Sequence, residues 1–150
     1  MTGKIEHVDD MPVYGLFHDL AVAVERQSRS FGPDFRWLRI QALRSSESCI
    51  ANLREGFYAQ YSTEYLQSLF RTKREARETV THLKYAVDVD QMPPVVVNEL
   101  LPRYEDALRQ LGALIKSIER KIKERGKAKP GAPKVREESP PYNVDFPPEH

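Results

Sequence analysis

The sequence predicts an all-α protein, an up-down-up-down bundle of four helices. No proline lies between Asp34 and Met92, and Gly56 is the only glycine between Gly32 and Gly112. Proline costs about 3 kcal/mol and glycine about 1 kcal/mol inside a helix, so this scarcity favours long helices. Apolar residues also recur at spacings of three and four along four segments, and no segment alternates as a strand would. The short loops between the segments predict antiparallel neighbours.

Composition divides the 150 residues into three parts. We expect an N-terminal extension over residues 1–13, the four-helix bundle over residues 14–123, and a tail over residues 124–150. The tail holds six of the eleven prolines and few apolar residues. It therefore cannot bury enough surface to offset the entropy lost on ordering, and we predict that it is flexible.

The first helix is expected over residues 13–29. Its apolar face repeats at helical spacing through Phe17, Leu20, Ala21 and Val24. A Phe-Gly-Pro-Asp stretch then ends the pattern, and Asp34 is placed to cap the next helix.

The second helix is expected over residues 35–57 and carries two apolar stripes. The first stripe is mostly small: Leu38, Ala42, Ser45, Cys49 and Leu53. The second consists of Ile40, Leu43 and Ile50, with Trp37 nearby. A helix that is apolar on more than one side needs more than one neighbour. This pattern is compatible with contacts between copies of the chain.

The third helix is expected from Ser62 or Thr63 to Val87, with Ser62 as its cap and Glu64 at the positive end of its dipole. Its stripe is Leu66, Leu69, Phe70, Ala76, Val80, Leu83 and Val87. The fourth helix shows a heptad seam: Val97, Leu101, Tyr104, Leu108, Leu111, Ile115, Ile118 and Ile122. Because Pro102 interrupts this seam, either the helix kinks there or the main helix begins near that residue.

Charge and cysteine content exclude several classes of protein. With 23 basic and 22 acidic residues the net charge is +1, which excludes a strongly basic nucleic-acid arm but not a local basic patch. The single cysteine, Cys49, excludes a disulfide within the chain and a cysteine-based zinc site. We find neither a membrane span nor a signal-peptide pattern, so we expect a cytoplasmic protein.

Motifs for catalysis and metal binding are weak. Glu78 precedes His82 by four residues, whereas the di-iron bundles use a Glu-x-x-His spacing on two helices. Cys49 lies in the small-residue stripe and is expected to be buried and inert. The sequence has no nucleophile elbow, phosphate loop or dinucleotide fingerprint. We therefore expect no enzyme, no metal and no other cofactor.

Two basic clusters are candidates for phosphate contact. The first lies on the third helix: Arg71, Lys73, Arg74 and Arg77. The second lies near the end of the fourth: Arg120, Lys121 and Lys123. Ion pairs within the third helix, Arg71 with Glu75 and Arg74 with Glu78, are expected to neutralise part of the first cluster. The aromatic run Phe57, Tyr58, Tyr61 and Tyr65 is expected to pack the bundle end or a subunit contact in preference to stacking bases.

Polar residues near the end of the second helix form an unusual motif. Arg44, Asn52 and Glu55 lie on or beside an apolar stripe, and Gly56 suits the left-handed position just past a helix end. A buried carboxylate needs a partner, which Arg44 or an arginine of the third helix could supply. We interpret the motif as structural, and an enzyme using these residues is the least favoured hypothesis.

These residues resemble a known family: bacterial four-helix-bundle proteins encoded within intervening sequences of large-subunit ribosomal RNA genes. The matching positions are Gln41, Arg44, Ser48, the run from Ala51 to Gly56, Glu64 and Tyr65. Phe17 to Leu20 resembles the opening of the family pattern, and Glu78 falls where the third helix carries a glutamate. Arg74 and Glu75 replace the usual Gly-Ser pair. The resemblance spans residues 14–123.

The resemblance implies an assembly and a loose function. Members form closed rings of five bundles and are related to accessory proteins of diversity-generating retroelements, which bind nucleic acid and a reverse transcriptase. We therefore predict a non-enzymatic homopentamer associated with RNA or DNA, with a reverse transcriptase or another protein as a further partner and no membrane contact. The alternative is a protein-interaction scaffold without nucleic-acid binding, using the proline-rich segment around Tyr142.

Overall fold

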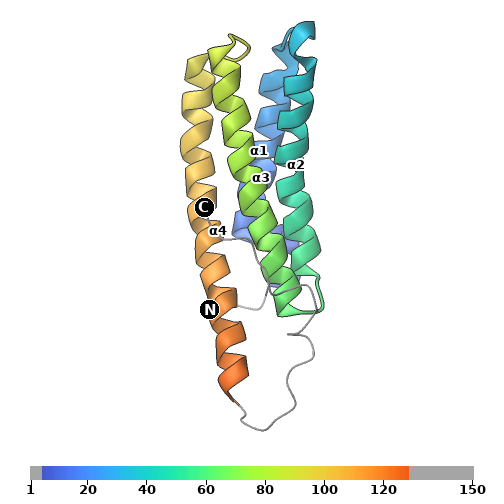
Figure 1. Ribbon diagram of the computed structural model, residues 1–150, viewed down its shortest axis with the longest axis vertical. Helices are drawn as coiled ribbons and strands as arrows, with labels where there is room; N and C mark the ends of the chain where they lie inside the picture. Colours follow the sequence, from blue (N-terminus) through green and yellow to red (C-terminus); the bar gives the residue numbers. More distant parts are fainter. Residues whose placement is uncertain (1–4, 129–150) are drawn as a thin grey trace.

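The computed structural model describes residues 5–128 and shows four long antiparallel helices (Figure 1). The helices are α1 (Pro12–Gln27), α2 (Arg36–Phe57), α3 (Ser62–Asp88) and α4 (Pro94–Ala128). Short 3-10 turns are η1 (Val8–Asp10), η2 (Ser28–Ser30) and η3 (Pro33–Phe35). No strand occurs within the described range, and the predicted all-α four-helix bundle is confirmed. Most of the predicted tail, residues 129–150, lies outside the described residues.

Each helix packs against the two that adjoin it around a single apolar core. The small-residue stripe of α2 and the α4 seam face this core as predicted, and Leu53, Tyr104 and Leu111 are at most 1% exposed. Ser45 and Thr79 form a hydrogen bond of 2.6 Å between α2 and α3. A buried hydroxyl needs such a partner, so this pair fixes the register of the two helices without exposing a polar group to the core.

The core extends further toward the N-terminus than predicted. Val8 is fully buried and Met11 is 7% exposed, so the apolar core includes residues of the segment predicted as an N-terminal extension. The backbone N–H of Val8 donates to the Tyr58 hydroxyl at 3.2 Å. The Arg54 guanidinium also donates to a carboxylate oxygen of Asp9 at 3.0 Å. These bonds join η1 to the end of α2, which pattern-based reading of the N-terminus could not reveal.

Neither predicted helix cap is correct. Pro33 starts the η3 turn, in which the Phe35 N–H donates to the Gly32 carbonyl at 2.9 Å. Asp34 therefore lies inside a helical turn, and Phe35 occupies the N-cap position of α2 without a side-chain cap bond. At the start of α3, Tyr61 is the N-cap and Ser62 is already helical.

The two loops at one end of the bundle are tied to each other. Asp90 has a positive φ of 60°, which turns the chain after α3. The N–H groups of Gln91 and Met92 then both donate to the Ala86 carbonyl. The Gln91 side-chain oxygen accepts a hydrogen bond of 2.7 Å from the Gly32 N–H in the α1–α2 connection.

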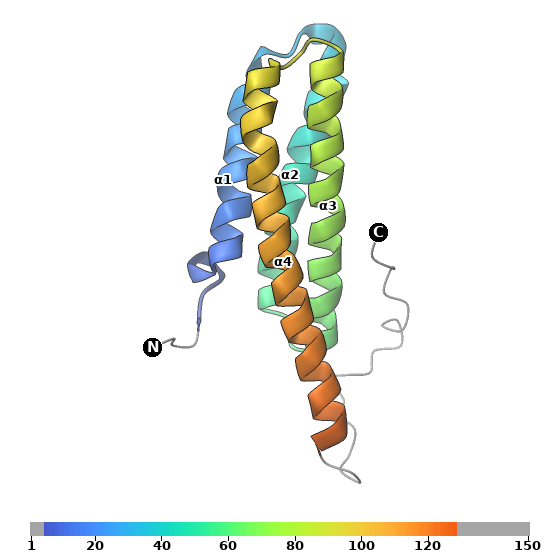
Figure 2. The same ribbon diagram turned by 90° about the vertical axis from the view of Figure 1, so that its left-hand side faces the viewer.

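Helix α4 is longer than the others and runs continuously through Pro102. Of the two predicted arrangements, the separate first turn is wrong, since α4 begins at Pro94. Its last turns extend past the start of α3 and project from the bundle (Figure 2). None of the helices in the described part of the chain is both long and apolar enough to cross a membrane.

Candidate nucleic-acid interface

A line of polar side chains runs along the outer junction of α2 and α3, which we call the α2–α3 seam (Arg44, Ser48, Asn52, Ser68, Arg71 and Glu75). At its centre Asn52 Nδ2 donates to the carbonyl and to the hydroxyl of Ser48, both at 2.9 Å. Asn52 Oδ1 accepts from Arg71 Nε at 3.0 Å. Arg71 Nη2 donates to Ser68 Oγ at 3.1 Å. Both helices are therefore joined by a half-buried network in which each side chain fixes the next.

Gly56 lies one turn beyond this network, inside α2, so its predicted left-handed position is wrong. A Cβ atom at residue 56 would lie 2.6 Å from Ser68 Cβ and 3.0 Å from Tyr65 Cδ1. The glycine is required because α3 passes too close for any side chain. Gly56 therefore permits a close approach of α2 and α3 and does not terminate α2.

The two charged residues of the α2 motif, Arg44 and Glu55, are exposed. Arg44 Nη2 donates to Gln41 Oε1 at 2.6 Å on the surface of α2. Glu55 is also exposed, so the prediction of a buried carboxylate paired with an arginine is wrong. The arginine supplied by α3 binds Asn52 instead. Packing therefore does not explain why Arg44 and Glu55 occupy these positions.

Two acidic residues of α3, Glu75 and Glu78, lie toward the Arg44 end of the α2–α3 seam. Burial raises the pKa of Glu75, the neighbouring Glu78 raises it further, and Arg74 and Arg44 act in the opposite direction. Glu78 Oε2 lies 3.7 Å from His82 Nε2. That nitrogen is buried and makes no hydrogen bond within the described part of the chain.

The structure divides the first basic cluster. Arg71 is half-buried and committed to Asn52 and Ser68, so its predicted pairing with Glu75 is wrong. Arg74 and Arg77 are exposed on the outer surface of α3, and Lys73 is half-exposed. Arg74 and Arg77 are thus the members of this cluster whose positions best suit contact with an external phosphate.

The second basic cluster, Arg120, Lys121 and Lys123, is exposed on the projecting part of α4. Equal counts from the α3–α4 loop place Arg120 opposite the start of α3 at Ser62. Arg74 lies twelve residues further along α3, about 18 Å at 1.5 Å per residue. The two clusters therefore form separate patches on one chain.

The aromatic run closes the end of the bundle from which α4 projects. The Tyr65 hydroxyl donates to Met11 Sδ at 3.6 Å, and Phe57 and Tyr58 meet edge to face with ring centroids 5.0 Å apart. Burial raises the pKa of Tyr65 to about 12. These contacts agree with the predicted packing role, although Tyr58 remains 54% exposed.

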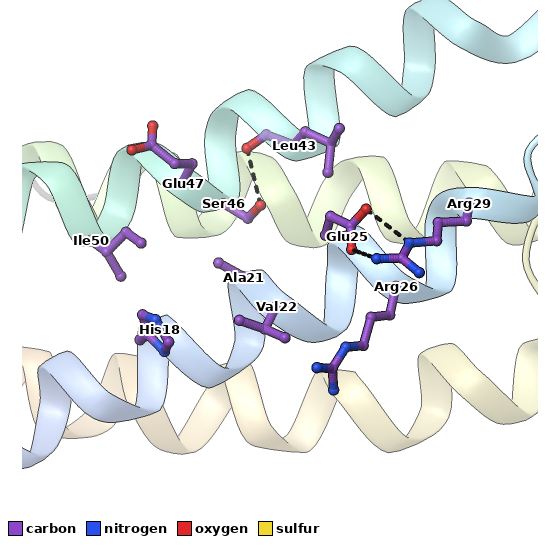
Figure 3. A pocket seen from close by; sticks show the side chains of 10 residues that line it. All are labelled: His18, Ala21, Val22, Glu25, Arg26, Arg29, Leu43, Ser46, Glu47 and Ile50. Carbon is purple, nitrogen blue, oxygen red and sulfur yellow. Dashed lines mark hydrogen bonds and ion pairs between the residues drawn. The ribbon is translucent and has the colours of Figure 1, made fainter.

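A groove of about 400 Å³ lies between α1 and α2 on another side of the bundle (Figure 3). Its apolar lining includes Ala21, Val22, Leu43 and Ile50. Glu25 lies at one end and bonds to Arg29 at 2.8 Å. Two members of the second apolar stripe of α2 thus turn toward α1 rather than fully outward.

Cys49 is buried in the core, and its thiol donates weakly to the carbonyls of Ser45 and Thr72. Burial in an apolar site raises the pKa of this thiol far above its usual range, so it stays protonated. Within residues 5–128, no three His, Cys, Asp or Glu side chains are placed to share a metal ion.

Four antiparallel helices around one apolar core define a four-helix-bundle protein. The chain belongs to the 23S rRNA-intervening sequence protein family, whose family model matches residues 9–113, well over half of its length. The resemblance drawn from the α2 motif is thereby confirmed at the level of the family. No curated protein was found to match the chain.

Proposed function

We propose that this protein is a non-enzymatic cytoplasmic homo-oligomer, a ring of five bundles, that associates with RNA or DNA. The observation that carries the proposal is the division of the α3 cluster. Arg71 stabilises the α2–α3 seam, whereas Arg74 and Arg77 stand exposed beside it. Exposed guanidinium groups suit phosphate oxygens, which they bind through paired N–H donors.

A single chain offers few cations for such contact. Arg74 and Arg77 on α3 and the Arg120 cluster on α4 are separate patches, and the net charge of the chain is +1. Repetition in an assembly compensates for this, because several weak contacts on one long ligand act with a high effective concentration. Self-assembly is therefore part of the proposed function rather than an addition to it.

Charge reversal tests the proposal. The variant Arg74→Glu/Arg77→Glu should bind a labelled RNA oligonucleotide at least about tenfold more weakly, since several phosphate contacts are lost per assembly. Arg103→Glu/Arg109→Glu is the matched control, because it changes charge equally at two α4 arginines already paired with Glu99 and Asp106. Equal affinities of the two variants would contradict the assignment of the α3 residues.

Protein partners are the second candidate. Trp37 is 51% exposed and Tyr85 is 42% exposed, with ring centroids 6.1 Å apart across α2 and α3. Exposed aromatic groups of this kind are typical of protein contacts. A scaffold without nucleic-acid binding, or a bridge to a reverse transcriptase, would use this surface. Recovery of a protein partner by wild-type chain but not by Trp37→Ala, with no bound RNA, would favour that function.

A further inference from the structure

The apolar groove between α1 and α2, which we call the α1–α2 groove, is left uncovered by the two helices that form it. Its lining follows α1 over residues 18–29 and α2 over residues 43–50 (Figure 3). Its apolar lining side chains are all half-buried: Ala21, Val22, Leu43 and Ile50. At 1.5 Å per residue the α1 side is about 16 Å long. A helix, with a diameter of about 10–12 Å, would need far more than the volume of this groove over that length, whereas an extended segment would not.

Arginine side chains outnumber carboxylates at the Glu25 end of the α1–α2 groove. The Glu25 carboxylate accepts from Arg29 Nη2 at 2.8 Å and from Arg39 Nη2 at 3.1 Å. Arg26 is exposed at the same end (Figure 3). Glu47, the other carboxylate of the lining, lies toward the opposite end. Three cations and one carboxylate therefore meet at the Glu25 end, which suits an acidic ligand.

The chain itself contains a segment of matching chemistry, residues 140–148. The segment reads Pro-Pro-Tyr-Asn-Val-Asp-Phe-Pro-Pro, so its apolar residues Tyr142, Val144 and Phe146 alternate with polar ones. Flanking prolines favour an extended backbone, in which alternate side chains point to the same side. From Tyr142 to Phe146 such a backbone spans about 13 Å, which is within the length of the groove. Residues 137–150 also hold four acidic residues and no lysine or arginine.

We propose that residues 140–148 dock in the α1–α2 groove of their own chain. In this docking the segment runs parallel to α1. Tyr142 lies beside Ile50, and Phe146 lies nearer to Glu25. The acidic residues on either side of Phe146 are thereby next to the three arginines, whose charge they complement. The apolar side chains of the segment cover the half-buried lining and remove it from water.

The connection from α4 is long enough for this docking. Ala128 lies eight residues beyond Arg120, hence about 12 Å past the level of the start of α3. Ile50 lies seven residues before the end of α2, about 10 Å in the opposite direction. Ala128 and Ile50 are therefore about 22 Å apart along the bundle. The thirteen residues between Ala128 and Tyr142 span up to about 43 Å when extended, which leaves enough length to pass around one helix.

Disulfide trapping in the full-length chain tests the docking. In the groove variant, Val22→Cys/Val144→Cys, the two new thiols meet in the docked state, so oxidation by copper phenanthroline should join them within one chain. The native Cys49 does not interfere, because its buried thiol stays protonated. The matched control is Thr81→Cys/Val144→Cys, which moves the first cysteine to the exposed surface of α3 beside the basic cluster. Trapping should be at least about tenfold faster in the groove variant, because docking raises the effective concentration of its two thiols.

Further substitutions in the groove variant test the chemistry of the contact. Tyr142→Ser/Phe146→Ser removes two apolar anchors and should slow trapping to the rate of the control. Arg26→Glu should slow trapping at least about threefold, because the acidic segment then meets another carboxylate. Arg103→Glu on α4, where the arginine pairs with Glu99, changes the charge equally and should leave the rate unchanged.

A second pair of positions keeps the test independent of Val22. Ile50→Cys/Tyr142→Cys should also form a disulfide within one chain, and circular dichroism confirms that each variant remains helical. Equal trapping rates in the groove variant and the control, or a rate that the two serines do not lower, would overturn the docking. Faster trapping at Thr81→Cys would place the acidic segment on the basic surface of α3 instead. Disulfides that form only between chains would place it in another copy, and would overturn the proposal as well.

Discussion

Arg71 Nε donates to Asn52 Oδ1 at 3.0 Å, so a residue expected to contact phosphate instead joins α3 to α2. The same guanidinium reaches Ser68 through Nη2 at 3.1 Å. The bond links the α2 motif to the basic cluster of α3 and separates the cluster into a structural arginine and two exposed ones. Stability and nucleic-acid binding should therefore respond to different arginines.

Arg71→Ala should lower the free energy of unfolding by about 1–2 kcal/mol, because Asn52 loses the donor to its half-buried oxygen. Arg74→Ala, on the exposed surface, should change it by no more than about 0.5 kcal/mol. Urea unfolding followed by circular dichroism measures both values. Arg71→Lys should lose less stability than Arg71→Ala but more than none, because lysine lacks the planar guanidinium that donates to Asn52 and Ser68 at the same time. A larger loss for Arg74→Ala than for Arg71→Ala would refute this division.

Gly56→Ala should destabilise the protein by about 1–3 kcal/mol, because the new methyl group overlaps Ser68 and forces α2 and α3 apart. Gly112→Ala is the matched control in α4. Nothing lies within 4 Å of a Cβ at that position, so the helix should gain about 0.5–1 kcal/mol. Thermal unfolding compares the two variants. The double variant Gly56→Ala/Ser68→Gly should recover part of the lost stability, because it removes the side chain that the new methyl group meets. A Gly56→Ala variant as stable as the wild type would contradict the close approach of α2 and α3 at this position.

Much of the bundle could be predicted because long helices leave a regular trace in sequence. The spacing of Leu38, Ala42, Cys49 and Leu53 marks the buried face of α2, and all four are at most 1% exposed. The α4 heptad likewise predicted the burial of Leu111. These positions obey local periodicity, which one helix expresses on its own.

Features that depend on two distant segments were not predictable in the same way. The need for glycine at residue 56 arises from Ser68 on another helix, and nothing in the surrounding α2 sequence indicates that approach. Val8 is buried where η1 packs against α1 and α2, although its own segment is short and acidic. The exchange of Glu75 for Asn52 as the partner of Arg71 has the same cause. The spacing of four residues between Arg71 and Glu75 permits an ion pair within α3, but it does not show that Asn52 on α2 is also within reach of Arg71.

The pH dependence of stability should reveal Glu75. Its pKa is raised above the ordinary value of 4.5, chiefly by burial and next by Glu78. The folded chain therefore retains a proton that the unfolded chain releases first, so this residue favours folding below about pH 4.5 and loses that contribution as pH rises through the folded pKa. Glu75→Gln does not titrate. The unfolding temperature of the variant minus that of the wild type should therefore increase as the pH rises from about 4 to about 7. A difference that stays constant or decreases over this range would contradict the raised pKa of Glu75.

Cys49 should report on unfolding. Its buried thiol has a raised pKa and stays protonated, whereas disulfide reagents react with the thiolate. The native protein should consume almost no such reagent, and the protein in denaturant should consume one equivalent per chain. Absorbance of the released thiol dye measures the reaction. Rapid labelling of the native protein would show that the α2–α3 core opens far more readily than its packing implies.

The salt dependence of RNA affinity tests the central claim most directly, namely that repeated arginines of α3 hold nucleic acid by its phosphates. The logarithm of the association constant should fall linearly with the logarithm of salt concentration, with a slope of about −0.7 per phosphate contact for a single strand. We predict a slope that corresponds to more contacts than one chain could supply, and a clearly shallower slope for Arg74→Glu/Arg77→Glu. An affinity that does not change with salt, or an identical slope for that variant, would contradict the account.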